Sequence, residues 1–219
     1  LTNAANSFGG AVTVTSARTA QIVASGALGL GGSFAGDLAA TASGAVVLGQ
    51  TSVAGAFALT AAGAVSQTAA LSVTGATTLA AGSNAITLNQ TLNDFGGLVT
   101  LSSGGAVTLT DVNALTVGGT TSGNLSLDAG GAVTLATTAV GGNLAIVAGG
   151  DIRQSAVGQS LTVQGTTTLT AGSHDIVLSN NGTAADAVLI NDFVGHVTVI
   201  SAHDLVLRDK NVLSFSSNT

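Results

Sequence analysis

The sequence predicts an all-β fold, a right-handed parallel β-helix (β-solenoid) with coils of about 18 residues. Three observations support this. Short apolar triplets recur at steps of eight residues in residues 95–119. Two interleaved series of such triplets advance together along the chain. The composition is rich in Gly, Val and Thr, and the chain has 31 Gly, no Pro and only 6% charged residues. Gly, Val and Thr are poor helix formers.

The expected strand cores are triplets whose outer two residues share one face, because side chains alternate along a strand. The inward face carries Val, Leu and Ile, and Thr is common on the outward face. Gly and Asn are expected at the corners, which need left-handed dihedrals. In chain order the clearest cores are Val99–Leu101, Val107–Leu109, Leu115–Val117, Leu125–Leu127, Val133–Leu135, Leu144–Ile146, Leu161–Val163, Thr167–Leu169, Ile176–Leu178, Val188–Ile190, Val197–Val199 and Leu205–Leu207.

Every second core belongs to one series, which indicates two strands per coil. The first series is Val107, Leu125, Leu144 and Leu161, whose members follow one another at intervals of about 18 residues. The second series, with the same intervals, is Leu115, Val133, Ile152 and Leu169. Parallel stacking then places Leu125 beside Val107 and Leu144. Right-handedness follows from strand twist and the usual crossover rule.

Two other folds use many short strands. An antiparallel sandwich or barrel does not explain why the paired series advance by one coil length. A left-handed hexapeptide helix requires an apolar residue at every sixth position, a pattern that is not evident.

A longer repeat overlies the coils. Residues 8–88 align with residues 95–178 at an offset of 87, which becomes 90 after a short insertion. Residues 1–219 are therefore expected to form one β-helical domain. Its supermodules span about 8–94, 95–192 and, in part, 193–219, and each complete one is expected to contain about five coils.

Composition excludes several classes of protein. The net charge of −6 with four scattered bases argues against nucleic-acid binding. No apolar run is long enough for a transmembrane helix. No signal peptide is recognisable, so an exported protein would contain this chain as a processed or excised piece. Absence of cysteine is compatible with export in an unfolded state.

The sharpest candidates for chemistry are His174-Asp175 and His203-Asp204, since adjacent His and Asp can join a metal site or a general-base pair. The interval between the two pairs is not an integral number of coils of about 18 residues. Solvated corner residues are therefore expected. Asp151 and Arg153 are expected to form a surface ion pair of small energetic worth.

Other polar residues have structural interpretations. Asn93-Asp94-Phe95 and Asn191-Asp192-Phe193 suggest turns, with Phe filling a corner of the core, rather than calcium sites. Gln67 and Gln154 replace inward apolar residues and are expected to mark a structural kink or to make an internal amide contact, rather than to form a binding site.

An enzyme on this fold would need clustered acids and bases. Asp37, Asp94, Asp111 and Asp128 are each alone on their coils, although Asp111 and Asp128 could form a pair at one corner as solvated residues. No catalytic residue, cofactor or metal is expected. The surface-contact candidates are Asn181 and Asp186, in the insertion SNNGTAADA after Leu178, together with His174 and His203. Asn181 also begins a possible glycosylation sequon.

Four segments indicate a family. The GG-A-V-T-L units at 104–109 and 130–135, the GG-D-I unit at 149–152 and N-D-F-G-G at 93–97 resemble filamentous haemagglutinin-like repeats. Those repeats belong to large exoproteins of Gram-negative bacteria that are exported by two-partner secretion. The resemblance implies a secreted or cell-surface adhesin that is exported through an outer-membrane transporter and has a right-handed β-helical shaft. Residues 1–219 would then be an internal fragment of this larger protein. Similar repeats occur in contact-dependent toxins and biofilm-matrix adhesins.

The expected function is therefore a structural shaft segment that projects a binding region for cell or matrix attachment. Its expected partners are the rest of its own chain, the transporter during secretion, and a host receptor or matrix polysaccharide. The alternatives are a β-helical carbohydrate-active enzyme, which needs a groove with three or more converging acids and bases, and a binding module, which needs a protruding loop.

Overall fold

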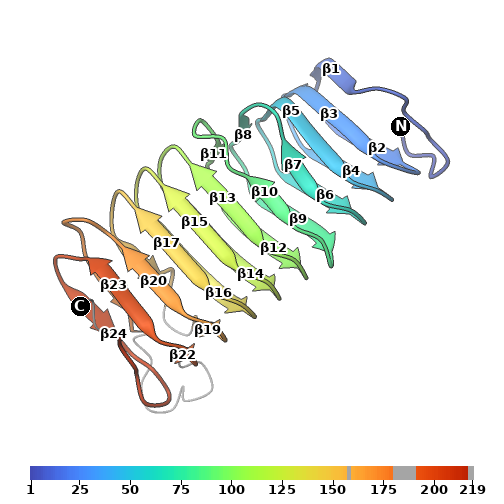
Figure 1. Cartoon of the computed structure of the whole chain (residues 1–219). Helices are drawn as coiled ribbons and strands as arrows, with labels where there is room; N and C mark the ends of the chain where they lie inside the picture. The colour runs from blue at the N-terminus through green and yellow to red at the C-terminus, as the bar shows by residue number, and fades with distance from the viewer. Residues whose placement is uncertain (157–158, 180–190, 217–219) are drawn as a thin grey trace.

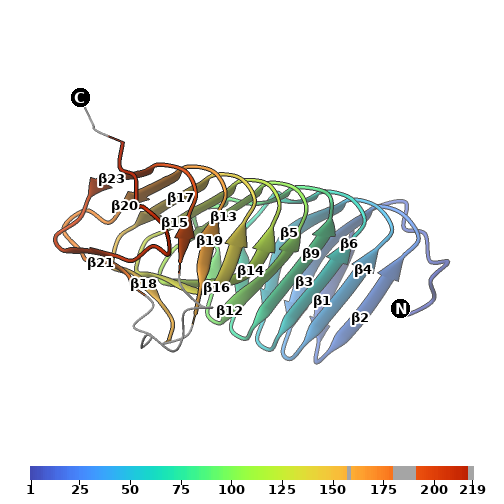
Figure 2. The same ribbon diagram turned by 90° about the horizontal axis from the view of Figure 1, so that it is seen from below.

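The computed structural model describes residues 1–156, 159–179 and 191–216, which form a rod of stacked β-coils. These residues contain 24 strands and no helix, and thus no helix that could cross a membrane. Neighbouring strands pair in parallel, so the predicted parallel β-helix is confirmed. Figure 1 shows the coils following one another from the N-terminal end of the rod to the C-terminal end, and Figure 2 shows the stack from below.

The strands divide into two sheets that run the length of the rod. The first sheet has, in spatial order, β1 (Val12–Ala17), β3 (Leu28–Phe34), β5 (Val46–Val53), β7 (Val65–Gln67), β10 (Ile86–Leu88), β13 (Val107–Asp111), β15 (Leu125–Ala129), β17 (Leu144–Ala148), β20 (Thr167–Thr170) and β23 (Val197–Ser201), with β8 (Leu71–Val73) and β11 (Asp94–Phe95) off this path. The second has β2 (Ala20–Ala24), β4 (Leu38–Ala42), β6 (Phe57–Ala61), β9 (Thr77–Gly82), β12 (Leu98–Ser103), β14 (Leu115–Thr121), β16 (Val133–Val140), β18 (Ile152–Gln154), β21 (Ile176–Leu178) and β24 (Leu205–Leu207), with β19 (Leu161–Val163) and β22 (Asp192–Phe193) off the path.

The register at the centre of the rod is the predicted one. Leu125 pairs with Val107 on one side and with Leu144 on the other. All three side chains are buried, as alternation along the strands requires. Each coil therefore stacks its aliphatic residues on those of the preceding coil.

The predicted fourth member of each series is wrong. Leu144 pairs with Thr167 rather than Leu161, and Ile152 pairs with Ile176 rather than Leu169. The cause is strand β16, which pairs with two short strands of the next coil, β18 and β19. The segment that joins these two strands makes this coil longer than its neighbours. The predicted core at 188–190 lies outside the described residues.

The core is one continuous column of buried apolar side chains that extends from Ile22 to Val197. Phe34, Phe57 and Phe95 are among its largest fully buried members. Phe95 and Phe193 are buried in the core, but they lie in the two-residue strands β11 and β22, whereas turns were predicted there. Because every coil contacts mainly its two neighbours, the stability of such a rod accumulates coil by coil.

Two glycines lie where the register between neighbouring strands shifts. Gly32 in β3 has φ of 139° and Gly119 in β14 has φ of 105°. A Cβ atom at Gly32 would lie 2.1 Å from the Val14 carbonyl oxygen, and one at Gly119 would lie 2.2 Å from that of Leu101. Only glycine fits both the dihedral and the close approach of the preceding coil.

Equivalent strands of the first two supermodules lie on opposite sheets. Strands β3 and β5 of the first sheet correspond, at the offset of 87, to β14 and β16 of the second. Strands β4 and β6 of the second sheet correspond in the same way to β15 and β17 of the first. From β1 to β10, nine strands lie on the main paths of the sheets. The supermodule is therefore four and a half coils rather than five, and its copies are half a turn out of phase.

Candidate functional site

The two His-Asp pairs lie side by side at one corner of the rod. Ile176 of β21 pairs with Leu205 of β24, so the chain between the two pairs makes a single enlarged coil. Asp175 and Asp204 immediately precede these strands and occupy equivalent positions on adjacent coils. The prediction that the pairs are out of register is therefore wrong, because it assumed a constant coil length.

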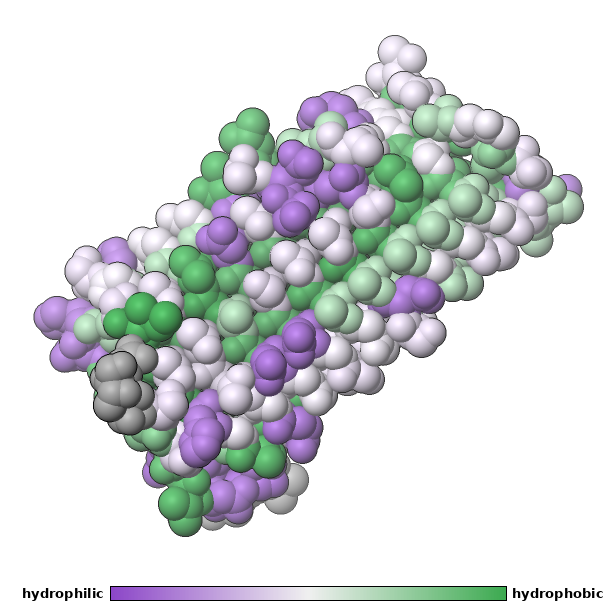
Figure 3. Space-filling model, viewed as in Figure 1, coloured by the Kyte–Doolittle hydropathy of each residue, from purple (hydrophilic) through white to green (hydrophobic). Residues whose placement is uncertain are grey.

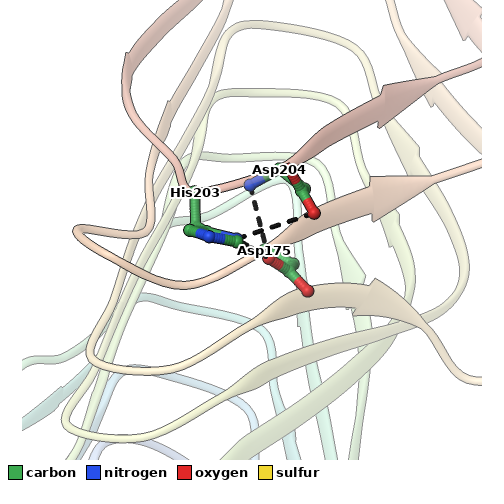
Figure 4. Close-up of side chains that lie close together, drawn as sticks. All are labelled: Asp175, His203 and Asp204. Atoms are coloured by element: carbon green, nitrogen blue, oxygen red, sulfur yellow. Dashed lines mark hydrogen bonds and ion pairs between the residues drawn. The ribbon is translucent and has the colours of Figure 1, made fainter.

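The resulting cluster contains Asp175, His203 and Asp204 (Figure 4). Nδ1 of His203 lies 3.1 Å from Oδ1 of Asp175 and 3.6 Å from Oδ2 of Asp204. One nitrogen and two carboxylate oxygens thus lie within 4.8 Å of one another. The Asp204 backbone N–H also donates to Oδ1 of Asp175, at 3.3 Å. The stacking of the coils, rather than a local loop, brings these ligand atoms together.

The same corner continues to the preceding coil through Asp151 and Arg153. The Asp175 backbone N–H donates to Oδ1 of Asp151 at 2.9 Å, so three aspartates stack on successive coils. Arg153 Nη2 lies 2.6 Å from Oδ2 of Asp151 and 4.0 Å from Oδ2 of Asp175. The predicted Asp151–Arg153 pair is confirmed. Its exposure makes it worth at most about 1 kcal/mol.

The other predicted surface residues are not part of this cluster. His174 is exposed, and its carbonyl oxygen accepts the His203 backbone N–H at 2.8 Å. His196 lies elsewhere, with Nδ1 2.8 Å from the Ser214 hydroxyl oxygen. Asn181 and Asp186 lie outside the described residues.

Sequence reasoning missed the partners of two glutamines. Gln67 and Asn93 form a head-to-tail amide pair, in which Gln67 Nε2 donates to Asn93 Oδ1 at 2.8 Å and Asn93 Nδ2 donates to Gln67 Oε1 at 2.9 Å. Asn93 also accepts the Leu71 backbone N–H and donates to the Leu88 carbonyl. The pair links the last residue of β7, Gln67, to the first residue of β8, Leu71, across the break between these two strands. The prediction of an internal amide contact is confirmed.

The next supermodule repeats this arrangement. Gln154 Nε2 donates to Asn191 Oδ1 at 2.8 Å, and Asn191 Nδ2 donates back to Gln154 Oε1 at 3.1 Å. Both asparagines are fully buried. The sequence did contain a signal for these pairs: Gln67 and Asn93 of the first supermodule recur as Gln154 and Asn191 in the second.

Asp111 is buried, which corrects the expectation of a solvated corner shared with Asp128. Asp111 pairs in register with Ala129, whereas Asp128 is exposed and pairs with Thr110. Burial raises the pKa of Asp111, although backbone N–H groups of Asn113 and Phe95 partly offset this by donating to its carboxylate. The Asp111 carboxylate therefore acts structurally: it accepts hydrogen bonds from two backbone N–H groups and holds this corner of the coil in place.

The outer surface is sparsely charged. Figure 3 shows hydrophilic side chains in separate groups on the face in view, between stretches of small and apolar residues. A hollow of about 300 Å³ over β3 and β5 is lined by Gly, Ala, Thr, Val, Leu and Gln, none of which is ionisable. This hollow offers no acid or base for catalysis.

Comparison with known proteins identifies a repeat family. A family model described as repeats of unknown function (DUF5649) matches residues 35–102, 104–134 and 122–200. The matched segments cover most of the coils described above. No curated protein and no solved structure matches the chain.

Proposed function

Since the chain belongs to the DUF5649 family of repeats, we propose from its geometry that it is a structural shaft segment of a secreted or surface-attached bacterial adhesin. In this role it is non-catalytic and holds a binding region away from the cell. The proposal places it within a longer chain that leaves the cell through an outer-membrane transporter. Attachment to a host receptor or matrix polysaccharide would then reside elsewhere in that chain.

The continuous core is the observation that carries this proposal. Buried apolar residues from Ile22 to Val197 form one cluster along the rod. Each coil adds about 4.8 Å of length, so the ten main-path strands of a sheet correspond to roughly 48 Å. A stiff rod of repeated coils suits a spacer, because length increases with each repeat while the cross-section stays the same.

The composition and the sequence resemblance support export. The chain has no cysteine, so no disulfide would obstruct passage of an unfolded chain. Coils that stack on their neighbours can fold one after another as the chain emerges. The segments similar to filamentous haemagglutinin-like repeats support an extracellular location and the two-partner route.

Surface labelling tests the location. Antibodies raised against the 219-residue chain should label intact cells of the producing bacterium or detect the protein in the medium. An antibody against a cytoplasmic protein serves as the control and should require permeabilisation. A signal that appears only in permeabilised cells would contradict an extracellular role.

Electron microscopy tests the spacer function. In-frame removal of residues 1–216 from the protein that carries them should shorten its projecting fibre by roughly 48 Å. The purified chain added in excess should leave adhesion of wild-type cells unchanged, because the shaft itself does not bind. Competition by the purified chain would instead identify it as a binding module.

A further inference from the structure

We propose that Asp175, His203 and Asp204 bind a single Zn²⁺ ion across two adjacent coils. The ligands would be Nδ1 of His203 and one carboxylate oxygen from each aspartate. This proposal does not depend on the adhesin function, since it concerns only the corner formed by β21 and β24.

The spacing of the ligand atoms fits zinc. In a tetrahedral site the ligand atoms lie about 2.0–2.2 Å from the ion, and hence about 3.4 Å from each other. The distances from His203 Nδ1 to Asp175 Oδ1 and to Asp204 Oδ2 are 3.1 and 3.6 Å. The two oxygens lie within 4.8 Å of each other. Only small side-chain movements are needed to close the set around an ion.

Neighbouring groups hold the ligands in position. Arg153 approaches Oδ2 of Asp175 at 4.0 Å, so Oδ1 is the oxygen that faces His203. The backbone N–H of Asp204 donates to this same Oδ1 at 3.3 Å. Such outer contacts orient metal ligands and tune their affinity. Arg153 already balances the charge of Asp151 at 2.6 Å, so Zn²⁺ would balance chiefly the charges of Asp175 and Asp204.

The ligand set selects zinc over calcium. Calcium requires six to eight oxygen ligands, whereas this cluster supplies one imidazole nitrogen and two carboxylates. Imidazole ligands suit Zn²⁺ and similar transition metals. The exposure of His203 and Asp204 leaves room for water to complete the coordination.

Zinc at this corner would crosslink the start of the enlarged coil to the start of the coil that follows it. Asp175 lies at the start of this coil, and Asp204 lies at the equivalent position where the next coil begins. An ion held by both would favour the folded position of β24 at the end of the rod. Unfolding temperature should therefore rise with zinc concentration, since a ligand that binds only the folded state stabilises it.

Calorimetric titration of the whole 219-residue chain with ZnCl₂ at neutral pH tests the site. We expect one ion per chain, binding weakened at least about tenfold in His203→Ala and Asp204→Asn, and unchanged binding in His196→Ala. His196 is the matched control because it contacts Ser214 rather than the cluster. CaCl₂ should give no comparable binding.

Three outcomes would overturn the proposal. They are no saturable zinc binding, equal binding in wild type and His203→Ala, or calcium binding as tight as that of zinc. Circular dichroism of each variant shows whether the β-structure is retained. A second readout, the zinc-induced rise in unfolding temperature, should be present in His196→Ala and absent in His203→Ala.

Discussion

Replacement of Asn93 by alanine tests whether the buried amide pair holds the interrupted sheet together. Asn93 is fully buried, and its side chain contacts Gln67, the Leu71 backbone N–H and the Leu88 carbonyl. In Asn93→Ala the Leu71 N–H and the Leu88 carbonyl both lose the side-chain partner that Asn93 supplied. Each buried polar group left unsatisfied costs about 1–3 kcal/mol.

The expected loss in the free energy of unfolding is therefore about 2–6 kcal/mol. Gln67 does not add a full further penalty, because its Nε2 still donates to the Ala69 carbonyl at 2.7 Å. Urea unfolding followed by circular dichroism measures the change. Hydrogen exchange at the Leu71 amide is a local readout, which is useful because repeat proteins can unfold in parts.

Asn113→Ala is the matched control. The Asn113 side chain donates to Oδ1 of Asp94 at 3.1 Å in an exposed contact, so its loss should cost no more than about 0.5 kcal/mol. If Asn93→Ala were as stable as Asn113→Ala, and the Leu71 amide exchanged no faster than in wild type, the reasoning about the amide pair would be refuted.

Three further substitutions test the corners and the core, each by urea unfolding. Gly119→Ala should destabilise by at least about 2 kcal/mol, because its dihedral and the adjacent coil exclude a Cβ, while Gly9→Ala, in open space, should change little. The raised pKa of Asp111 means that the folded state binds its proton more tightly, so this residue's contribution to stability falls as pH rises above 3.8. The free energy of unfolding of wild type, relative to that of Asp111→Asn, should therefore decrease as pH rises above 3.8. An increase would show that the pKa of Asp111 is lowered by folding and not raised. Thr167→Val should raise the free energy of unfolding by about 1 kcal/mol, because the buried Thr167 hydroxyl has no hydrogen-bond partner. Thr108→Val, at a partly exposed position, is the control and should give no such increase.

The alternation of residues was sufficient to predict the fold where coils have constant length. Val107, Leu125 and Leu144 are inward residues at regular spacing, and parallel stacking follows from that spacing. Prediction failed at Leu161 and Leu169, where a coil contains one more short strand. Apolar triplets look alike in every strand, so they reveal that a strand exists without revealing which coil it belongs to.

The candidate site was harder to predict for the same reason. Whether His203 meets Asp175 depends on the length of one coil, and this coil is enlarged. Each His-Asp pair was recognisable by itself, whereas their meeting depends on strand pairing that the local sequence does not encode. The partners of Gln67 and Gln154 were likewise hidden, since each asparagine is distant along the chain.

The half-integral number of coils in a supermodule has a consequence for anything that recognises the repeat. Matching side chains of consecutive supermodules point to opposite flanks of the fibre, about 22 Å apart along its axis. A ligand specific for one flank would find its epitope again only after two supermodules. Longer chains built from this unit would display two alternating lines of identical epitopes, which would allow neighbouring fibres to be bridged from both sides.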